Sequence, residues 1–150
     1  MMKSEKKGAF MTKIIIEIKS TIDQLDDDIQ KIEMTTEGEL YEKNGHIFLV
    51  YQESELSGME GSKTMLKITG DTVTMNRFGG TSSKMIFDID HPSKSVYHTP
   101  YGDFDMVVTT EFIDKDVDVE KASGHIRIKY NMLLENVSNS INQLEINIRS

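Results

Sequence analysis

Short runs of alternating apolar and polar residues, separated by hairpin dipeptides, constrain the fold of this chain more than any other feature. In the first run, Ile14, Ile16 and Ile18 lie at every second position. Successive side chains of a β-strand point to opposite faces, so this period of two predicts strands with one buried face. Asn44-Gly45 and Gly70-Asp71 lie between such runs, and both dipeptides tolerate the positive φ angles of a two-residue hairpin turn. With no convincing long helix in the pattern, the sequence predicts an all-β chain of consecutive hairpins.

The alternation predicts about nine or ten strands in succession. Because hairpins join consecutive strands, we expect an antiparallel meander. A twisted sheet of that many strands is expected to curl and close, since closure removes exposed edges. We therefore predict an all-β fold with a single antiparallel meander β-barrel of about 8–10 strands, in preference to a two-sheet sandwich. The predicted strands cover residues 14–19, 29–42, 46–53, 63–69, 72–78, 84–90, 95–99, 104–113, 125–132 and 144–148.

The length of 150 residues suits one domain with a single core. We expect a flexible leader at residues 1–12 and a single β-barrel domain at residues 13–150. Gly38 lies inside the second predicted strand, where a glycine favours a bend or a bulge. The acidic segment 114–120 separates two alternating runs, and we expect it to form a loop.

Charge and composition argue against several functional classes. The formal net charge is −8, and a field of this sign disfavours binding to nucleic acid. The absence of cysteine excludes disulfides, thiolate metal sites and cysteine nucleophiles, and it fits a reducing compartment. No apolar stretch has the length of a signal peptide or of a membrane span. We therefore predict a cytoplasmic protein that binds neither nucleic acid nor a membrane.

Arg77 is the residue whose predicted position most needs a partner. It shares a strand face with Val73 and Met75, so it is expected to point into the barrel. A buried guanidinium is costly unless it is paired. Glu53 is the predicted partner, because its strand places it on the same face as Tyr51 and two aliphatic residues. The sequence thus predicts an internal ion pair between Arg77 and Glu53.

Two interpretations of this ion pair remain open. It can fix the strand register inside a filled barrel, or its arginine can bind a carboxylate or phosphate of a ligand bidentately. Four residues are expected to supply further hydrogen bonds and complete a hypothetical ligand-binding set: Tyr51, Tyr97, Thr99 and Tyr130.

The segment Tyr97–Gly102 predicts a rigid corner of the barrel. Pro100 fixes its own φ and holds Thr99 extended, while Gly102 permits a turn conformation. His98 is opposite in parity to Tyr97, so we expect it to face solvent. The alternative is that His98 or Tyr97 lines the mouth of the barrel.

An ordered set of motifs runs through the predicted strands: Gly38 and Tyr41, Tyr51-x-Glu53, Thr64-x-Leu66-x-Ile68, Arg77 and Gly79, Met85-x-Phe87, Tyr97-x-Thr99-Pro100-x-Gly102, Thr110, and the strand Gly124–Tyr130. This set resembles the YwiB-like family, a domain of unknown function with a calycin-like, lipocalin-type β-barrel. The resemblance spans residues 14–148 and implies a fold, since the family has no established activity. One departure is the acidic segment 114–122, which looks extended relative to the family.

No catalytic or metal-binding constellation is recognisable in the sequence. There is no G-x-S-x-G nucleophile elbow, and Asp103 and Asp105 are expected to be solvated carboxylates. The histidines lack the spacing of metal ligands; they are His46, His91, His98 and His125. We therefore predict no catalytic residue, metal or cofactor.

Three functional hypotheses follow, in order of preference. The first is a non-enzymatic protein that binds a small anionic or amphipathic molecule inside the barrel. The second is a structural or interaction module with a side-chain-filled barrel, which acts through exposed residues such as Ile15 and Phe48. The third is an enzyme. The expected partners are a small-molecule ligand and a second copy of the chain in a homodimer.

Overall fold

The computed structural model describes residues 11–24, 29–53, 61–80 and 82–150. Within these ranges the chain forms ten β-strands and no helix, which confirms the predicted all-β class. The strands are β1 (Thr12–Asp23), β2 (Gln30–Lys43), β3 (His46–Gln52), β4 (Lys63–Thr69), β5 (Thr72–Phe78), β6 (Ser83–Phe87), β7 (Ser93–Thr99), β8 (Gly102–Asp118), β9 (Ser123–Leu134) and β10 (Ser138–Arg149).

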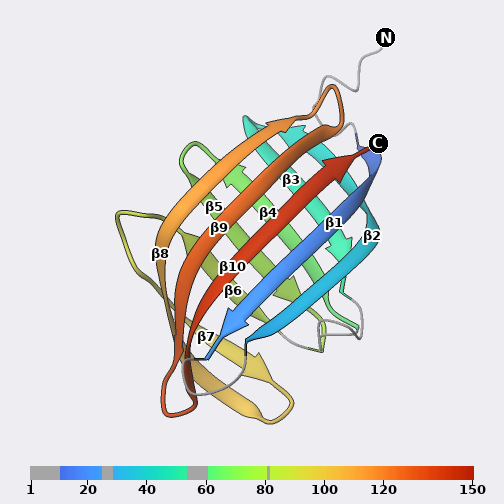
Figure 1. Cartoon of the computed structure of the whole chain (residues 1–150). Coiled ribbons are helices and arrows are strands. Elements are labelled where there is room, and N and C mark those ends of the chain that lie inside the picture. Colours follow the sequence, from blue (N-terminus) through green and yellow to red (C-terminus); the bar gives the residue numbers. More distant parts are fainter. Residues whose placement is uncertain (1–10, 25–28, 54–60, 81) are drawn as a thin grey trace.

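The ten strands form one antiparallel sheet that curls into a nearly closed barrel (Figure 1). Each strand pairs with its neighbour in sequence from β1 to β6 and from β7 to β10. β1 also pairs with β10, so the first and last strands lie side by side as the blue and red ribbons of Figure 1. Their register sets Ile16 opposite Ile148, and both side chains are buried. The predicted antiparallel meander barrel is confirmed.

The ends of the sheet, β6 and β7, meet at what we call the β6–β7 seam. Among the described residues, one isolated backbone bridge, at Ser82, joins the two strands. Serine hydroxyls make further contacts across the seam. Ser93 Oγ accepts a hydrogen bond from the Ile86 N–H at 3.3 Å, and Ser95 Oγ donates to the Lys84 carbonyl at 2.8 Å. Side-chain hydrogen bonds thus take the place of a continuous backbone ladder at this seam.

The strand register aligns large apolar side chains in rows across the barrel interior. One row crosses β2 to β6, and each of its members is at most 3% exposed. A row of this kind excludes water from the middle of the barrel. Its members are Leu40, Leu49, Leu66, Met75 and Met85. The next row, nearer the β4–β5 hairpin, consists of Ile47, Ile68, Val73 and Phe87.

The prediction that the acidic segment 114–120 forms a loop is wrong. β8 continues to Asp118, which pairs with the first residue of β9. The acidic side chains of this stretch meet basic side chains on the neighbouring strand. Asp114 Oδ2 lies 2.5 Å from Arg127 Nη2 and 3.2 Å from His125 Nε2. Cross-strand charge pairing therefore extends the strand and shortens the turn to residues 119–122.

The bulge predicted at Gly38 is also wrong. β2 keeps a continuous register there, with Gly38 opposite Ile14 on β1 and opposite Tyr51 on β3. The glycine is required by close packing instead. A Cβ atom at this position would lie 2.3 Å from Ile16 Cδ1 and 2.7 Å from the Val50 carbonyl oxygen. The register shift of the sheet lies on β8, just after Thr110.

The N-terminal boundary stays a prediction for most of its length. β1 begins at Thr12, the last residue of the predicted leader, whereas residues 1–10 lie outside the described residues. The described residues include no helix that is long and apolar enough to cross a membrane.

Candidate functional site

The barrel interior contains a cavity near one end. Its volume is about 270 Å³, it lies where β1, β3, β5, β7 and β9 end, and every strand except β4 contributes to its lining. The buried apolar rows continue the interior away from this end, and Met85 of the first row also lines the cavity. Sites for small molecules usually have volumes of roughly 300–1,000 Å³, so this cavity lies just below that range and suits a small ligand.

One inward row beside the cavity is polar. Tyr51, Thr64, Arg77 and Ser83 lie directly opposite one another on β3, β4, β5 and β6. Directly opposed side chains on one face of a sheet are close enough to interact. We call these four residues the polar row. Tyr51, Arg77 and Ser83 line the cavity, and Thr64 is fully buried.

Glu53, the residue after β3, pairs with the arginine of the polar row. Arg77 Nε lies 3.5 Å from Glu53 Oε2, and the side chains are 16% and 3% exposed, respectively. The Thr64 hydroxyl donates a hydrogen bond to the same carboxylate oxygen. The Glu53 N–H donates to the Ser62 carbonyl at 2.8 Å, which anchors the backbone. The predicted ion pair is confirmed, and so is the inward orientation of Arg77, since its neighbour Phe78 is exposed.

The guanidinium retains unused donor capacity. Among the described residues, its hydrogen bond to Glu53 comes from Nε alone. A guanidinium carries five N–H donors in a planar fork, so the two terminal Nη groups are available to solvent or to a ligand. Ser83, directly opposite Arg77, has a buried hydroxyl without a hydrogen-bond partner in the described chain. The donor groups of the polar row that remain available are therefore those of Arg77.

The two most enclosed tyrosines of the cavity are neutral. Burial raises the pKa of Tyr51, the charge of Glu53 raises it further, and Arg77 opposes the change. Burial also raises the pKa of Tyr130, whose ring packs against Phe87 with centroids 4.8 Å apart. Both phenols keep their protons at neutral pH, so they can form hydrogen bonds but do not act as phenolate bases.

Flexible apolar side chains form much of the remaining lining. Met34, Met85, Met106 and Met132 reach the cavity from β2, β6, β8 and β9. Methionine is unbranched and polarizable, so it adapts to irregular shapes. On the far wall, Asn142 Nδ2 donates to Ser140 Oγ at 2.9 Å. The aliphatic lining residues are Ile18, Ile22, Ile32 and Leu144.

Five of the six residues in the hypothetical ligand-binding set line this cavity: Tyr51, Glu53, Arg77, Tyr97 and Tyr130. Thr99 does not. Its hydroxyl donates to the Gly102 carbonyl at 2.9 Å and accepts from the Tyr101 N–H at 3.1 Å. These bonds close the β7–β8 turn, which is the predicted corner. His98 is exposed, as predicted, and pairs with Asp103 at 3.0 Å.

Sequence reasoning missed Thr64, Ser83 and Asn142 as residues of the site, and it suggested an adaptable apolar cavity for the methionines without saying which of the ten would line it. Thr64 and Ser83 share the inward parity of their strands, so parity could have placed them on the interior face. Their alignment with Arg77 depends on the stagger between strands, which alternation within a single strand does not specify.

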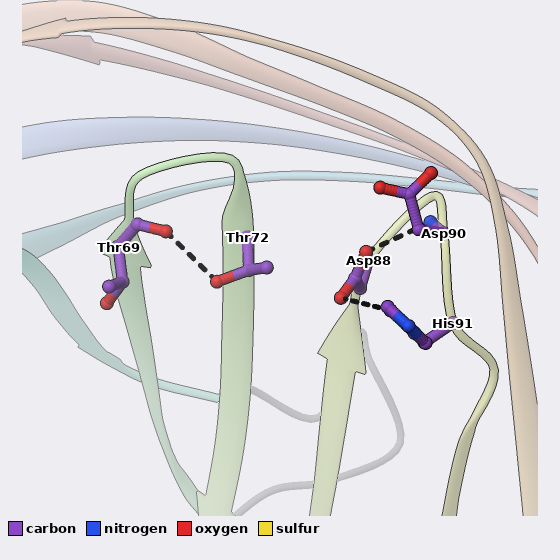
Figure 2. A network of polar contacts seen from close by, with 5 residues as sticks. All are labelled: Thr69, Thr72, Asp88, Asp90 and His91. Carbon is purple, nitrogen blue, oxygen red and sulfur yellow. Dashed lines mark hydrogen bonds and ion pairs between the residues drawn. The ribbon is translucent and has the colours of Figure 1, made fainter.

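A second hollow, of about 390 Å³, lies at the opposite end of the barrel and is acidic. Figure 2 shows that one of its carboxylates, Asp88, stabilises the turn after β6: it accepts from the Asp90 N–H at 2.9 Å and lies 3.2 Å from His91 Nδ1. In the neighbouring β4–β5 turn, Thr72 donates to the Thr69 carbonyl at 3.0 Å. The Asp90 N–H lowers the pKa of Asp88. Within the described ranges no three His, Asp or Glu residues are grouped as a metal site. The Asp88 carboxylate therefore holds the turn between β6 and β7.

Comparison with known proteins identifies the family. The model of a family described as a domain of unknown function (DUF1934) matches residues 16–146. The chain belongs to this family. It is 30% identical over 121 residues to the uncharacterised beta-barrel protein YwiB of Bacillus subtilis strain 168, covering 81% of this chain and 82% of that protein. The resemblance predicted from the ordered motifs is thereby confirmed.

The fold has a counterpart among solved structures. The crystal structure of the ywiB protein from Bacillus subtilis is similar to this chain with a TM-score of 0.84 at 23% identity, and the match covers 97% of this chain and 96% of that one. At this identity the likeness establishes the fold alone. The DUF1934 family and its YwiB relative thus support the barrel, and the function has to be argued from the cavity.

Proposed function

We propose that this protein binds a small amphipathic or anionic molecule inside its barrel and does not transform it. The observation that carries the proposal is the cavity of about 270 Å³, which combines four methionines with the polar row at one end of an otherwise filled interior. A site with an apolar body and a few convergent polar groups is typical of small-molecule binding.

Binding is favoured over catalysis by the chemistry of the lining. The carboxylate of Glu53 is engaged by Arg77 and Thr64, and Tyr51 is protonated. These contacts use the groups that a general base or a nucleophile would need. The absence of cysteine from the chain supports a reducing compartment, and our proposal places the protein in the cytoplasm.

The alternative of a filled structural barrel has less support. The apolar rows do fill one half of the interior, but the hollow half is inconsistent with a barrel plugged by its own side chains along its whole length. The surface residue Phe48, a predicted contact for this alternative, is partly covered by Tyr41, whose ring stacks on it at a centroid distance of 5.0 Å.

Native mass spectrometry of the purified protein tests the proposal, with organic extraction to identify any retained molecule. The wild type should carry a small molecule or take one up from a mixture of amphipathic compounds. Met132→Trp should abolish retention, because the indole would occupy cavity volume. Leu133→Trp is the matched control, because Leu133 follows Met132 on the same strand and its side chain is 38% exposed. A wild type that retains nothing, or equal retention by M132W and the wild type, would contradict the proposal.

A further inference from the structure

The charges inside the cavity constrain the ligand more narrowly than its size does. Among the described residues that line the cavity, the ionised side chains at neutral pH are Arg77 and Glu53. Their charges cancel, and they are in contact with each other. Tyr51 and Tyr130 remain protonated because burial raises the pKa of each phenol. The described lining of the cavity is thus already electrically balanced.

An anionic ligand would disturb this balance in one of two ways. It could lie beside the intact ion pair, which would leave one uncompensated negative charge in the interior. It could instead take Arg77 away from Glu53, and the carboxylate, which is 3% exposed, would then be buried without its partner. Burying an unpaired charge is costly in both cases.

A neutral ligand avoids this cost and still uses the free donors. Arg77 lines the cavity, and its two Nη groups make no hydrogen bond to a described residue. A carbonyl or hydroxyl oxygen of a ligand can accept hydrogen bonds from these groups without changing the net charge.

Building on the proposed function, we propose that the cavity selects an uncharged amphipathic molecule and discriminates against the corresponding anion. The apolar body of the ligand lies among Met34, Met106 and Met132, and its oxygen acceptor faces Arg77. Within the proposed function, the ligand is therefore an uncharged amphipathic molecule and not an anionic one.

A matched pair of probes tests this selectivity: octanamide and octanoate have the same chain length and differ in head-group charge. Isothermal titration calorimetry near neutral pH measures the affinity of the full-length protein for each. The wild type should bind octanamide at least about tenfold more tightly than octanoate, because the anion carries a buried-charge penalty.

Two variants separate the electrostatic cause from other causes. Glu53→Gln leaves Arg77 without a counter-charge, so the ratio of affinities should shift toward octanoate by about tenfold or more. Glu33→Gln removes the same charge from an exposed position on β2 and should keep the wild-type ratio.

The failures of the two proposals are distinguishable. Octanoate binding that equals or exceeds octanamide binding in the wild type overturns the charge selectivity and leaves ligand binding intact. An unchanged ratio in a folded E53Q variant overturns it as well. If the wild type binds neither probe nor any other amphipathic compound, the proposed function itself is refuted, and this inference with it.

Discussion

Replacing Arg77 by leucine removes one half of the buried ion pair and leaves the other half in place. Glu53 would keep the hydrogen bond from Thr64 but lose its counter-charge, although its side chain is only 3% exposed. Removing one partner of a buried pair costs about 3–5 kcal/mol, because the remaining charge is uncompensated. The expected loss lies at the lower end of that range, about 3 kcal/mol, because Arg77 is 16% exposed and the two atoms are 3.5 Å apart.

Urea unfolding at neutral pH measures this loss. In thermal unfolding, a loss of about 3 kcal/mol in a chain of this size corresponds to a decrease in Tm of about 6–12 °C.

Arg127→Leu is the matched control, because it breaks another arginine–carboxylate contact in the same sheet. Arg127 and its partner Asp114 are 53% and 39% exposed, so the expected change is below about 1 kcal/mol. The double variant Arg77→Leu, Glu53→Leu should recover much of the stability lost by R77L, since no buried charge remains. If R77L loses no more stability than R127L, the pair is not buried and the electrostatic account of the cavity fails.

Three further predictions concern the packing of the barrel, its seam and its tyrosines. Gly38→Ala should destabilise the protein by about 1–3 kcal/mol in urea unfolding, because its Cβ would lie 2.7 Å from a backbone oxygen. Ser93→Ala should speed hydrogen exchange of the Ile86 amide in NMR spectra, since that amide donates across the β6–β7 seam to the serine hydroxyl. Burial raises the pKa of Tyr51, so the folded state keeps a proton that the unfolded state loses. The contribution of Tyr51 to the free energy of unfolding should therefore be fully present below about pH 10 and decrease above it. Tyr51→Phe should reduce this alkaline loss of stability.

Each of these predictions has a matched control in the chain. A Cβ atom at Gly80 would meet nothing within 4 Å, so G80A should leave stability nearly unchanged. Ser95→Ala removes a hydrogen bond to the Lys84 carbonyl and leaves the partner of the Ile86 amide in place. It should therefore affect hydrogen exchange of the Ile86 amide less than Ser93→Ala does. Tyr101 is 93% exposed, so Y101F should follow the wild type in alkaline solution. Indistinguishable behaviour of any variant and its control would contradict the structural reason given for that variant.

Alternation within single strands was sufficient to predict the barrel and the centre of the site. Parity placed Arg77 and Glu53 on the interior, and the high cost of burying an isolated guanidinium predicted that the two would pair. The tyrosines on the same faces followed from the same argument. These predictions held because they depend on the direction of a side chain within one strand, which a period of two determines.

The remaining features depend on relations between strands, and alternation does not contain them. The polar row exists because Tyr51, Thr64, Arg77 and Ser83 occupy matching positions after the stagger of four strands is set. The acidic segment that contains Asp114 predicts a loop, but Arg127 lies opposite Asp114 on β9 and supports a strand there. A glycine such as Gly38 predicts a bend or a bulge, whereas its contact with Ile16 of the neighbouring strand is a relation that alternation does not contain.

The number of strands accounts for the presence of both packed rows and a cavity inside the barrel. A barrel of about eight strands is just wide enough for its own side chains to fill it, and a wider barrel leaves space unless its inward residues are large. In this ten-stranded barrel, rows of leucine, methionine and phenylalanine meet that requirement at one end. At the other end the inward positions include Ser20 and Ser83, which are too small to meet it. The cavity thus lies where small polar residues replace large apolar ones, and the same substitution supplies the polar groups that a bound molecule would contact.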